Sequence, residues 1–322
     1  MKVKPSTEDY VIISPVRNEA KYLPRTIEAV AKQTLLPKRW IIVDDGSSDE
    51  TAAIAEAAAA QYNWIRVVRR SDRGYRQPGG GVIDAFYDGY NQMGGLDWQF
   101  IVKLDGDLSF VPDYFTRCLL HFQQDPRLGI GGGTICKETS GHLSPESTVD
   151  PAFHVRGATK IYRRECWERI GGLIRAPGWD TVDEFKANML GWSTYTFPEI
   201  QVLHYRPAGQ AQGNWKNWVK NGRANYVTGY HPLFVLLKSV NRLKSKPYGI
   251  AALGLLTGYV EGYLRRVPRV GDQQLIRYVR DQQMRRLLNR ESLWTQKPFK
   301  PAPTQCVPLV QSLSQAPAPH SS

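Results

Sequence analysis

The first residues whose types and spacing could do chemistry are two aspartates separated by one glycine, Asp105 and Asp107. The segment before them, residues 100–104, is apolar and β-branched, which predicts a buried strand. Ligands of open α/β sheets bind where the strands end, so we expect both carboxylates there. Carboxylates at alternate positions can hold Mg²⁺ or Mn²⁺, which often also contacts substrate phosphates. The alternative is an ordinary turn, since Asp and Gly are common turn residues.

A second apolar segment, residues 40–43, also ends on two carboxylates, Asp44 and Asp45. If this strand and the strand before Asp105 are neighbours in the sheet, their acids lie along one edge. Turn chemistry alone explains such a convergence less well than a binding site does.

A basic, glycine-rich segment, residues 69–81, leads into an expected helix over residues 82–93. Backbone amides at a helix start, with arginines alongside, favour anions, and Arg73 is the candidate contact from this loop. The Gly-Lys-Ser/Thr ending of a Walker loop is missing. No Gly-x-Gly-x-x-Gly follows the first strand either, so a dinucleotide fingerprint is absent.

Three acids stand together at the start of a later helix: Asp180, Asp183 and Glu184. They could act in the site, or they could merely complement the helix dipole. His204 follows at the end of another expected strand. A lone histidine is more often structural, but one at a strand end could join a metal shell.

The elements that must position these residues alternate between strands and helices. Strands are expected at residues 10–14, 40–43, 64–68 and 98–104, and helices at 22–33, 51–60 and 82–93. This alternation predicts a doubly wound, mostly parallel α/β sheet. Ser47 and Glu50 have the spacing of a capping box before the second helix. Further on, we expect a surface loop at residues 138–151 and short strands at 195–198 and 201–205.

Composition limits the classes of binding partner that the chain could have. The 322 residues suit one large α/β domain or a domain with an appendage, and Lys plus Arg exceed Asp plus Glu by 12. That excess favours an anionic partner, such as nucleic acid, a phosphorylated substrate or an acidic membrane face. The four cysteines lack Cys-x-x-Cys spacing, so neither a zinc knuckle nor a redox pair is indicated. Residues 1–10 lack the apolar core of a signal peptide, so we expect a cytoplasmic active site.

Four segments together resemble a family 2 glycosyltransferase with the nucleotide-sugar-binding fold called GT-A. They are Ser14–Glu19, Val43–Asp49, Lys103–Asp107 and Trp179–Glu184. The resemblance covers about residues 10–204. It implies inverting transfer of a sugar from a UDP-, GDP- or dTDP-sugar to a saccharide or lipid-linked acceptor, in cell-surface or exopolysaccharide synthesis.

The resemblance also implies roles for individual residues. The positions implied to contact the nucleotide sugar are Pro15, Arg17, Glu19, Asp44, Asp45 and Asp105. Asp44 or Asp45 would meet the base or ribose. Asp107, the second acid of an Asp-x-Asp pair, would bind the divalent cation that bridges the donor diphosphate.

Inverting members of this family use a carboxylate as base on the acceptor hydroxyl. It usually belongs to a Glu-Asp pair about a helix length before a Gly-aromatic pair, and counting back from Gly191 places Asp180 on that aspartate. Trp179 stands where the family has Glu, a departure that leaves Asp183 and Glu184 as rivals. The Gln-x-x-Arg-Trp motif is absent, which argues against a cellulose- or hyaluronan-type synthase.

The last third of the chain lies outside the resemblance. Residues 214–230 mix aromatic and basic side chains without a recognised nucleic-acid motif, so an acceptor cleft or membrane-interface patch is favoured over nucleic acid. Residues 248–264 are apolar but contain Glu261 and are shorter than the ~20 residues of a span. Arginines follow, which predicts peripheral contact with an anionic membrane or else a solvated basic helix.

We therefore expect three parts. Residues 1–206 form the nucleotide-sugar-binding catalytic domain, residues 207–294 a basic, aromatic helical extension, and residues 295–322 a disordered, Pro- and Ser-rich tail. Localisation is expected to be cytoplasmic, with peripheral contact at the inner face of the plasma membrane. The alternative function is a non-catalytic sugar-nucleotide fold or a nucleic-acid-binding protein, although no nucleic acid is expected as partner.

Overall fold

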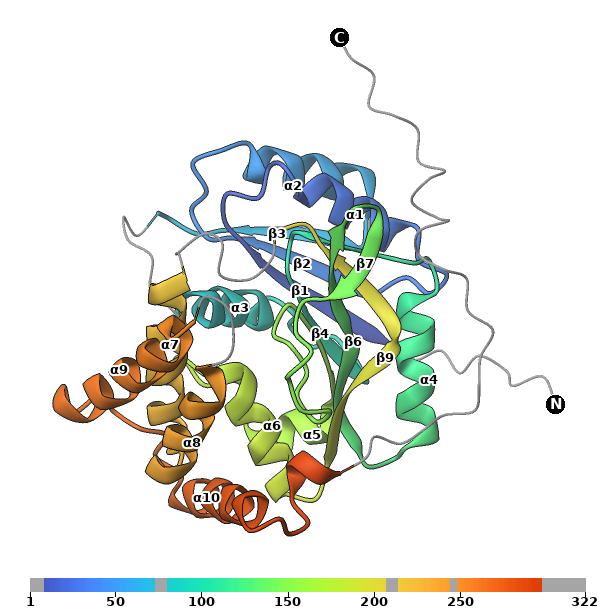
Figure 1. Cartoon of the computed structure of the whole chain (residues 1–322). Helices are drawn as coiled ribbons and strands as arrows, with labels where there is room; N and C mark the ends of the chain where they lie inside the picture. The colour runs from blue at the N-terminus through green and yellow to red at the C-terminus, as the bar shows by residue number, and fades with distance from the viewer. Residues whose placement is uncertain (1–8, 73–79, 207–213, 244–247, 297–322) are drawn as a thin grey trace.

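The computed structural model describes residues 9–72, 80–206, 214–243 and 248–296, and it combines one mixed sheet with flanking helices and a helical extension (Figure 1). The strands are β1 (Tyr10–Val16), β2 (Arg39–Asp44), β3 (Ile65–Arg69), β4 (Phe100–Leu104), β5 (Leu108–Phe110), β6 (Leu128–Thr139), β7 (His142–Pro145), β8 (Thr159–Arg163) and β9 (Ser193–His204). The helices of the domain are α1 (Leu23–Ala31), α2 (Thr51–Gln61), α3 (Gly81–Asn91), α4 (Tyr114–Gln124), α5 (Arg164–Ile170) and α6 (Trp179–Met189). The extension contains α7 (Asn214–Val227), α8 (Pro232–Arg242), α9 (Ile250–Leu264), α10 (Gln273–Leu287) and η1 (Leu293–Thr295).

The sheet has the order β3-β2-β1-β4-β8-β6-β9-β5, with β7 paired to β6. Its first four strands are parallel, as the alternation predicts, whereas β8 runs antiparallel between β4 and β6. β2 and β4 are not neighbours, because each pairs with β1 from opposite sides. Their carboxyl ends still lie at the same edge of the sheet, one strand apart, so the acids that follow them are expected to converge there.

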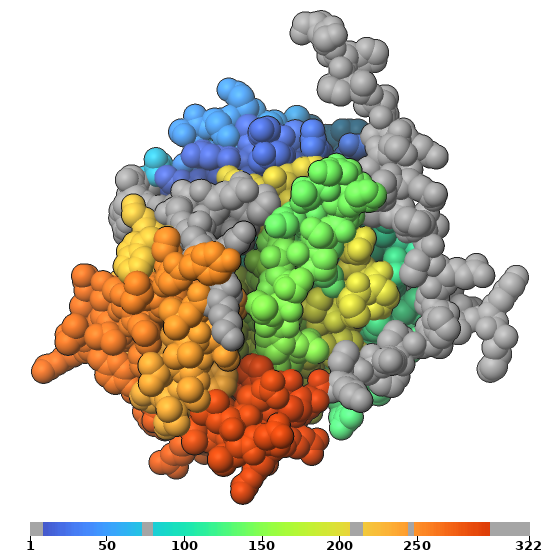
Figure 2. Space-filling view, viewed as in Figure 1, coloured from blue at the N-terminus to red at the C-terminus, as the bar shows by residue number. Residues whose placement is uncertain are grey.

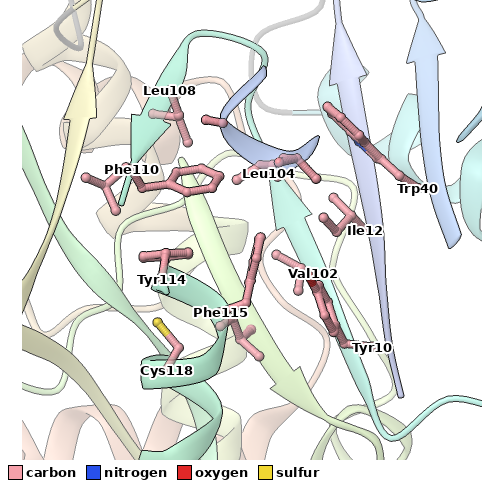
Figure 3. Close-up of a cluster of buried hydrophobic side chains, with 14 of the residues drawn as sticks. Tyr10, Ile12, Trp40, Val102, Leu104, Leu108, Phe110, Tyr114, Phe115 and Cys118 are labelled. Atoms are coloured by element: carbon pink, nitrogen blue, oxygen red, sulfur yellow. The ribbon is translucent and has the colours of Figure 1, made fainter. Parts of the chain in front are cut away.

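The central strands are buried on both faces, as parallel strands covered by helices must be. Tyr10 and Ile12 of β1 belong to a cluster with α1, α2 and α4, and Figure 3 shows them beside Val102 and Phe115. The alternate residues of β1 point the other way and pack with α3, α5 and α6. Both faces of the central strands are thus largely apolar, with Ser14 of β1 and Lys103 of β4 as buried polar exceptions.

The extension packs against the domain through a third cluster, which joins Phe185 of α6 to Tyr226 and Tyr230 around the end of α7. In the space-filling view the extension, coloured from gold through orange to red, forms the left and lower side of the face shown (Figure 2). No helix among the described residues combines the length and apolarity that crossing a bilayer requires.

Several local expectations differ from the structure. The expected loop at residues 138–151 contains the β6–β7 hairpin, and the two short strands expected after residue 194 are one strand, β9. The capping box is wrong: Glu50 is the N-cap of α2 without a side-chain cap, and the Asp49 carboxylate instead accepts the Thr51 amide at 3.0 Å. The expected tail begins inside η1, and residues 297–322 lie outside the described residues.

Candidate active site

The loop after β1 is fixed by the loop after β2. Pro15 is buried at the end of β1, and Asn18 follows in a left-handed conformation with φ 55°. The Asn18 side chain accepts the Ser48 amide at 2.9 Å, and the Glu19 amide donates to the Thr51 hydroxyl at 2.8 Å. These bonds place the Glu19 carboxylate at the edge of the sheet.

The acids after β2 are already paired with neighbouring groups. Asp44 accepts the backbone amide of Ser47 at 3.2 Å, and Asp45 forms an ion pair with Arg70. Arg17 spans the same loop, since its guanidinium donates to the Asp45 carbonyl at 3.2 Å and to Asp72 at 2.7 Å. The predicted contacts of Asp44, Asp45 and Arg17 with a nucleotide stay predictions. Arg73 lies outside the described residues.

The Asp-Gly-Asp turn after β4 packs closely against β1. A Cβ on Gly106 would lie 2.7 Å from Val16 Cγ1, so only glycine fits this approach. The Asp105 carboxylate pairs with Lys103, whose ammonium also donates to the Gly157 carbonyl at 2.6 Å. Burial raises the pKa of Asp105, and the Lys103 charge opposes that rise.

The Asp107 carboxylate faces two cationic side chains from the end of β9. His204 Nε2 and an Arg206 guanidinium nitrogen each lie 3.4 Å from Asp107 Oδ2, and Arg206 also pairs with Glu19. His204 Nδ1 is 2.6 Å from Glu146. Burial alone would lower the pKa of His204, but its bonds to Asp107 and Glu146 raise it to about 9. The pairing of β5 with β9 thus brings residues far apart in sequence to one carboxylate.

We tested whether these residues fit a divalent cation. Within the described residues, no three His, Cys, Asp or Glu side chains form a ready-made metal site. Magnesium, however, commonly takes one or two carboxylates and fills its shell with substrate phosphates and water. Glu19 Oε2 is buried without a partner among the described residues, and burial beside Asp107 raises the pKa of Glu19 to about 7. The buried Glu19 oxygen without a partner and the Asp107 carboxylate are hard oxygen donors, so the donor set fits a divalent cation.

Asp180 occupies the first turn of α6, the helix that begins after Gly178. Gly178 has φ 87°, a conformation that glycine adopts without the strain of a Cβ. The Asp180 side chain is partly exposed, and its backbone carbonyl accepts a 2.6 Å hydrogen bond from Lys160. Trp179, which replaces the family's Glu, is buried with Lys103 and Lys160 at 5.4 and 5.7 Å from its ring centre.

Asp183 and Glu184 belong to a buried ion network instead. The Lys160 ammonium is 2.9 Å from Asp183 and 2.7 Å from Glu184, and these three side chains are at most 1% exposed. Asp183 also accepts the Tyr162 hydroxyl at 2.7 Å. Glu184 accepts the Val155 amide at 2.7 Å and contacts His154 at 2.9 Å, so it anchors the loop before β8. Neither acid faces solvent, which favours Asp180 as the group that meets an acceptor.

The acids of the turn and of α6 are joined by a short chain of contacts. Lys103 bridges Asp105 and the Gly157 carbonyl. A Cβ on Gly157 would lie 2.9 Å from the Trp179 ring and 3.4 Å from Asp180 Cβ. The Asp-Gly-Asp turn and the start of α6 therefore border one region of the molecule.

Sequence reasoning missed five residues of this region: Lys103, Glu146, His154, Lys160 and Arg206. Two of these gave a local signal. Lys103 is a lysine within an otherwise apolar strand, and Arg206 lies two residues after His204. The partners of the other three come from α6, from β9 and from the segment before β8, and nothing in the local pattern predicts them.

Residues 11–170 match the model described as Glycosyl transferase family 2. The chain carries a family 2 glycosyltransferase domain. Among curated relatives, an undecaprenyl-phosphate 4-deoxy-4-formamido-L-arabinose transferase of Serratia proteamaculans is 35% identical over 119 residues, 36% of this chain and 34% of that protein. A polyprenol monophosphomannose synthase of Mycolicibacterium smegmatis is 27% identical over 183 residues, 52% of this chain and 66% of that protein. The chain thus spans about a third of the length of the first relative.

Solved structures share the fold of this chain. A mannosyltransferase from Pyrobaculum calidifontis, in complex with GDP-Man and Mn²⁺, aligns with TM-score 0.51 at 16% identity, over 85% of this chain and 80% of that one. GalNAc-T7 with UDP, GalNAc and Mn²⁺ aligns with TM-score 0.57 at 14% identity, over 90% of this chain and 56% of that one. The predicted GT-A fold is confirmed.

Proposed function

We propose that this chain is an inverting glycosyltransferase that moves a sugar from a nucleotide-sugar donor to a lipid-linked acceptor. One observation carries the proposal: in a family 2 domain, Asp107, Glu19 and Arg206 meet at the sheet edge, in the region that the start of α6 borders. The two curated relatives named above have undecaprenyl phosphate or polyprenol in their names, which supports a lipid carrier.

The donor side of the region suits a diphosphate leaving group. As the sugar–phosphate bond breaks, negative charge grows on the diphosphate, and cationic groups stabilise that charge. Arg206 is the described cation best situated to do so, since it now pairs with Glu19 and Asp107 and would exchange those carboxylates for the phosphates. A divalent cation on Asp107, with Asp105 as a further candidate ligand, would supply additional charge to the diphosphate. His204 could join these ligands only as a neutral imidazole, after losing the proton that Asp107 and Glu146 stabilise. Mn²⁺ in the two aligned structures supports this assignment.

The acceptor side needs an oxygen nucleophile aimed at the sugar. The acceptor oxygen attacks the anomeric carbon, the bond to the diphosphate breaks, and the nucleoside diphosphate leaves. If the acceptor oxygen is a hydroxyl, Asp180 takes its proton as general base. If it belongs to a carrier phosphate, whose second pKa is about 6, no proton has to be removed near neutral pH. Asp180 then orients the acceptor instead.

Binding of donors tests this proposal without knowledge of the acceptor. We expect one or more of the UDP-, GDP- and dTDP-sugars to stabilise the wild-type chain in a thermal-shift screen with Mn²⁺. Asp107→Asn should still unfold cooperatively without ligand, at a melting temperature lowered by the loss of its contacts with His204 and Arg206, but it should lose the Mn²⁺-dependent shift. Asp113→Asn, at the start of α4, is a matched control and should shift like wild type. Shifts that are equal in Asp107→Asn and insensitive to EDTA would refute the assignment, and no shift with any donor would favour the non-catalytic alternative.

A further inference from the structure

The positive charge of the chain is concentrated in the helical extension. Residues 207–296 contain 15 Lys and Arg against four Asp and Glu, a net charge of +11. Residues 1–206 contain 25 basic and 26 acidic residues, a net charge of −1. The excess is therefore no general feature of the surface, and it belongs to a segment outside the family match.

Helix α8 carries its apolar stripe on the outside. Its large exposed side chains are Leu233, Leu236, Leu237 and Val240, followed by Leu243 just after the helix. Their spacing of three and four residues puts them on one helix face. The buried residues Val235 and Ser239 lie on another face. A surface helix of a globular protein normally turns such a stripe toward the core, so this face is made for an apolar surface outside the chain.

Helix α9 also has exposed apolar side chains. Its glycines Gly254, Gly258 and Gly262 pack against α7, and a Cβ on Gly258 would overlap the Val219 carbonyl oxygen. This Gly-x-x-x-Gly stripe is thus already used within the chain. The exposed side chains of α9 are Ile250, Leu253, Val260, Tyr263 and Leu264.

The two helices meet near Trp218 at the start of the extension. The Arg242 guanidinium lies 5.2 Å from the Trp218 ring centre, and a Cβ on Gly254 would lie 2.6 Å from Trp218 Cβ. The end of α8 therefore adjoins the first turns of α7 and α9. Trp215 and Tyr248, both exposed, and Lys216 belong to these same segments. Aromatic and basic side chains beside aliphatic ones are typical of the membrane–water interface.

We propose that the exposed face of α8 and α9, with the α7 start, docks on the surface of an anionic lipid bilayer. Charge complementarity selects this occupant, because neither α7 nor α8 contains an acidic residue and the extension as a whole carries a net charge of +11. α9 has 15 residues, about 22 Å of helix, which is shorter than a ~30 Å hydrocarbon core. The face lies on the membrane and does not cross it.

The start of α7, at one end of the docking face, is connected to the candidate active site by a short segment. α7 begins eight residues after Arg206, a span of at most about 28 Å. The inference rests on the proposed function only for the purpose of docking, which is to present a lipid-linked acceptor to the site. Vesicle binding itself can be measured without donor or acceptor.

Co-sedimentation of the full chain with vesicles tests the docking face. Wild type should bind phosphatidylcholine vesicles that contain about a third phosphatidylglycerol at low salt and bind more weakly at high salt. The variant Leu236→Glu/Leu253→Glu should bind at least about tenfold more weakly, because it places charges on the apolar face. Leu236 and Leu253 are 48% and 59% exposed. The matched control, Leu36→Glu/Leu288→Glu, changes two leucines outside α8 and α9 that are 46% and 59% exposed. The control should bind like wild type.

Three results would overturn the proposal: no binding of wild type to anionic vesicles at low salt, equal binding of the two double variants, or equal binding to pure phosphatidylcholine. Light scattering adds a further check. If wild type is a dimer that does not bind vesicles, and Leu236→Glu/Leu253→Glu is a monomer, the face is instead the interface with a second copy of the chain. Donor thermal shifts of the same variants should equal those of wild type, so a failure of docking is distinguishable from a failure of the glycosyltransferase assignment.

Discussion

At the scale of residues, the three acids of α6 have different surroundings, so substitutions of Asp180 and Asp183 should affect different properties of the protein. Asp180→Asn should lower transfer to an acceptor hydroxyl by about 10²–10⁴-fold, because removal of a general base typically costs that much. Its donor affinity should stay near wild type, since Asp180 would meet the acceptor. Steady-state kinetics with donor titration measure both quantities.

Asp183→Asn should instead act on stability. It removes one of the two carboxylates that the buried Lys160 ammonium contacts. Because Glu184 remains 2.7 Å away, the loss of unfolding free energy should be smaller than the ~3–5 kcal/mol typical of a buried charge left without any partner. Urea unfolding monitored by circular dichroism measures the loss, with Asp281→Asn on the exposed side of α10 as control. An Asp183→Asn variant that is stable but inactive, beside an active Asp180→Asn, would make Asp183 the base.

His154 gives the buried network a pH dependence. Burial would lower the pKa of His154, but Glu184, with smaller contributions from Asp180 and Asp150, raises it to about 9 from 6.5. A group whose pKa is raised by folding stabilises the folded state fully at pH values below its unfolded-state pKa. It loses this stabilisation as the pH rises through its folded-state pKa. We expect the unfolding free energy to fall by about 2–3 kcal/mol more in wild type than in His154→Gln between pH 6.5 and 9. Equal urea midpoints of both proteins at each pH would contradict this.

Whether the sequence could predict a site residue depended on how far along the chain its contacts lie. The placement of Asp107 and Asp180 in the fold could be predicted, because each stands at the end or start of an element with a clear local pattern. The burial of Asp183 was not predictable, since it depends on Lys160 of β8, which reaches α6 only through the antiparallel insertion of β8 beside β4. Arg206 was missed for the same reason: its partner Glu19 is 187 residues away in the chain.

At the scale of elements, the parallel half of the sheet could be predicted and the rest only in part. Strands β1 to β4 alternate with helices, and each is a short apolar segment. β9 was predicted as two strands, because Pro198 and Glu199 interrupt its apolar pattern. In the neighbouring strand β6, the pairing with β9 shifts register between Gly133 and Thr134, so the residues around Pro198 bulge without ending the strand. Local patterns do not reveal such pairing.

The packing of α9 on α7 leads to a prediction at the same scale. Gly258→Ala should destabilise the chain, because the added methyl group would overlap the Val219 carbonyl oxygen. Helix propensity alone predicts the opposite sign, since Ala is favoured over Gly by about 1 kcal/mol in a helix. Gly271→Ala, where a Cβ meets no atom within 4 Å, is the control. A melting temperature of Gly258→Ala at or above wild type would show that the two helices do not pack this closely.

At the scale of the whole molecule, a nearly neutral family 2 domain is joined to a strongly basic helical extension. The extension contacts α6 through Phe185 and Tyr230, so the helix that carries Asp180 lies between the sheet and the extension. This arrangement fits the proposed function, in which the donor binds on one side of the candidate site and a lipid-linked acceptor on the other.

Formation of a glycolipid is the most direct measurement of this account. The full chain would be incubated with undecaprenyl phosphate in vesicles, Mn²⁺ and, in turn, UDP-, GDP- and dTDP-sugars, and lipid products would be detected by mass spectrometry. We expect one donor class to give a sugar-modified lipid with release of an equal amount of nucleoside diphosphate. Both products should disappear with EDTA and in Asp107→Asn, and persist in Asp113→Asn. Product that forms equally in Asp107→Asn, or no product from any donor that binds, would contradict the account.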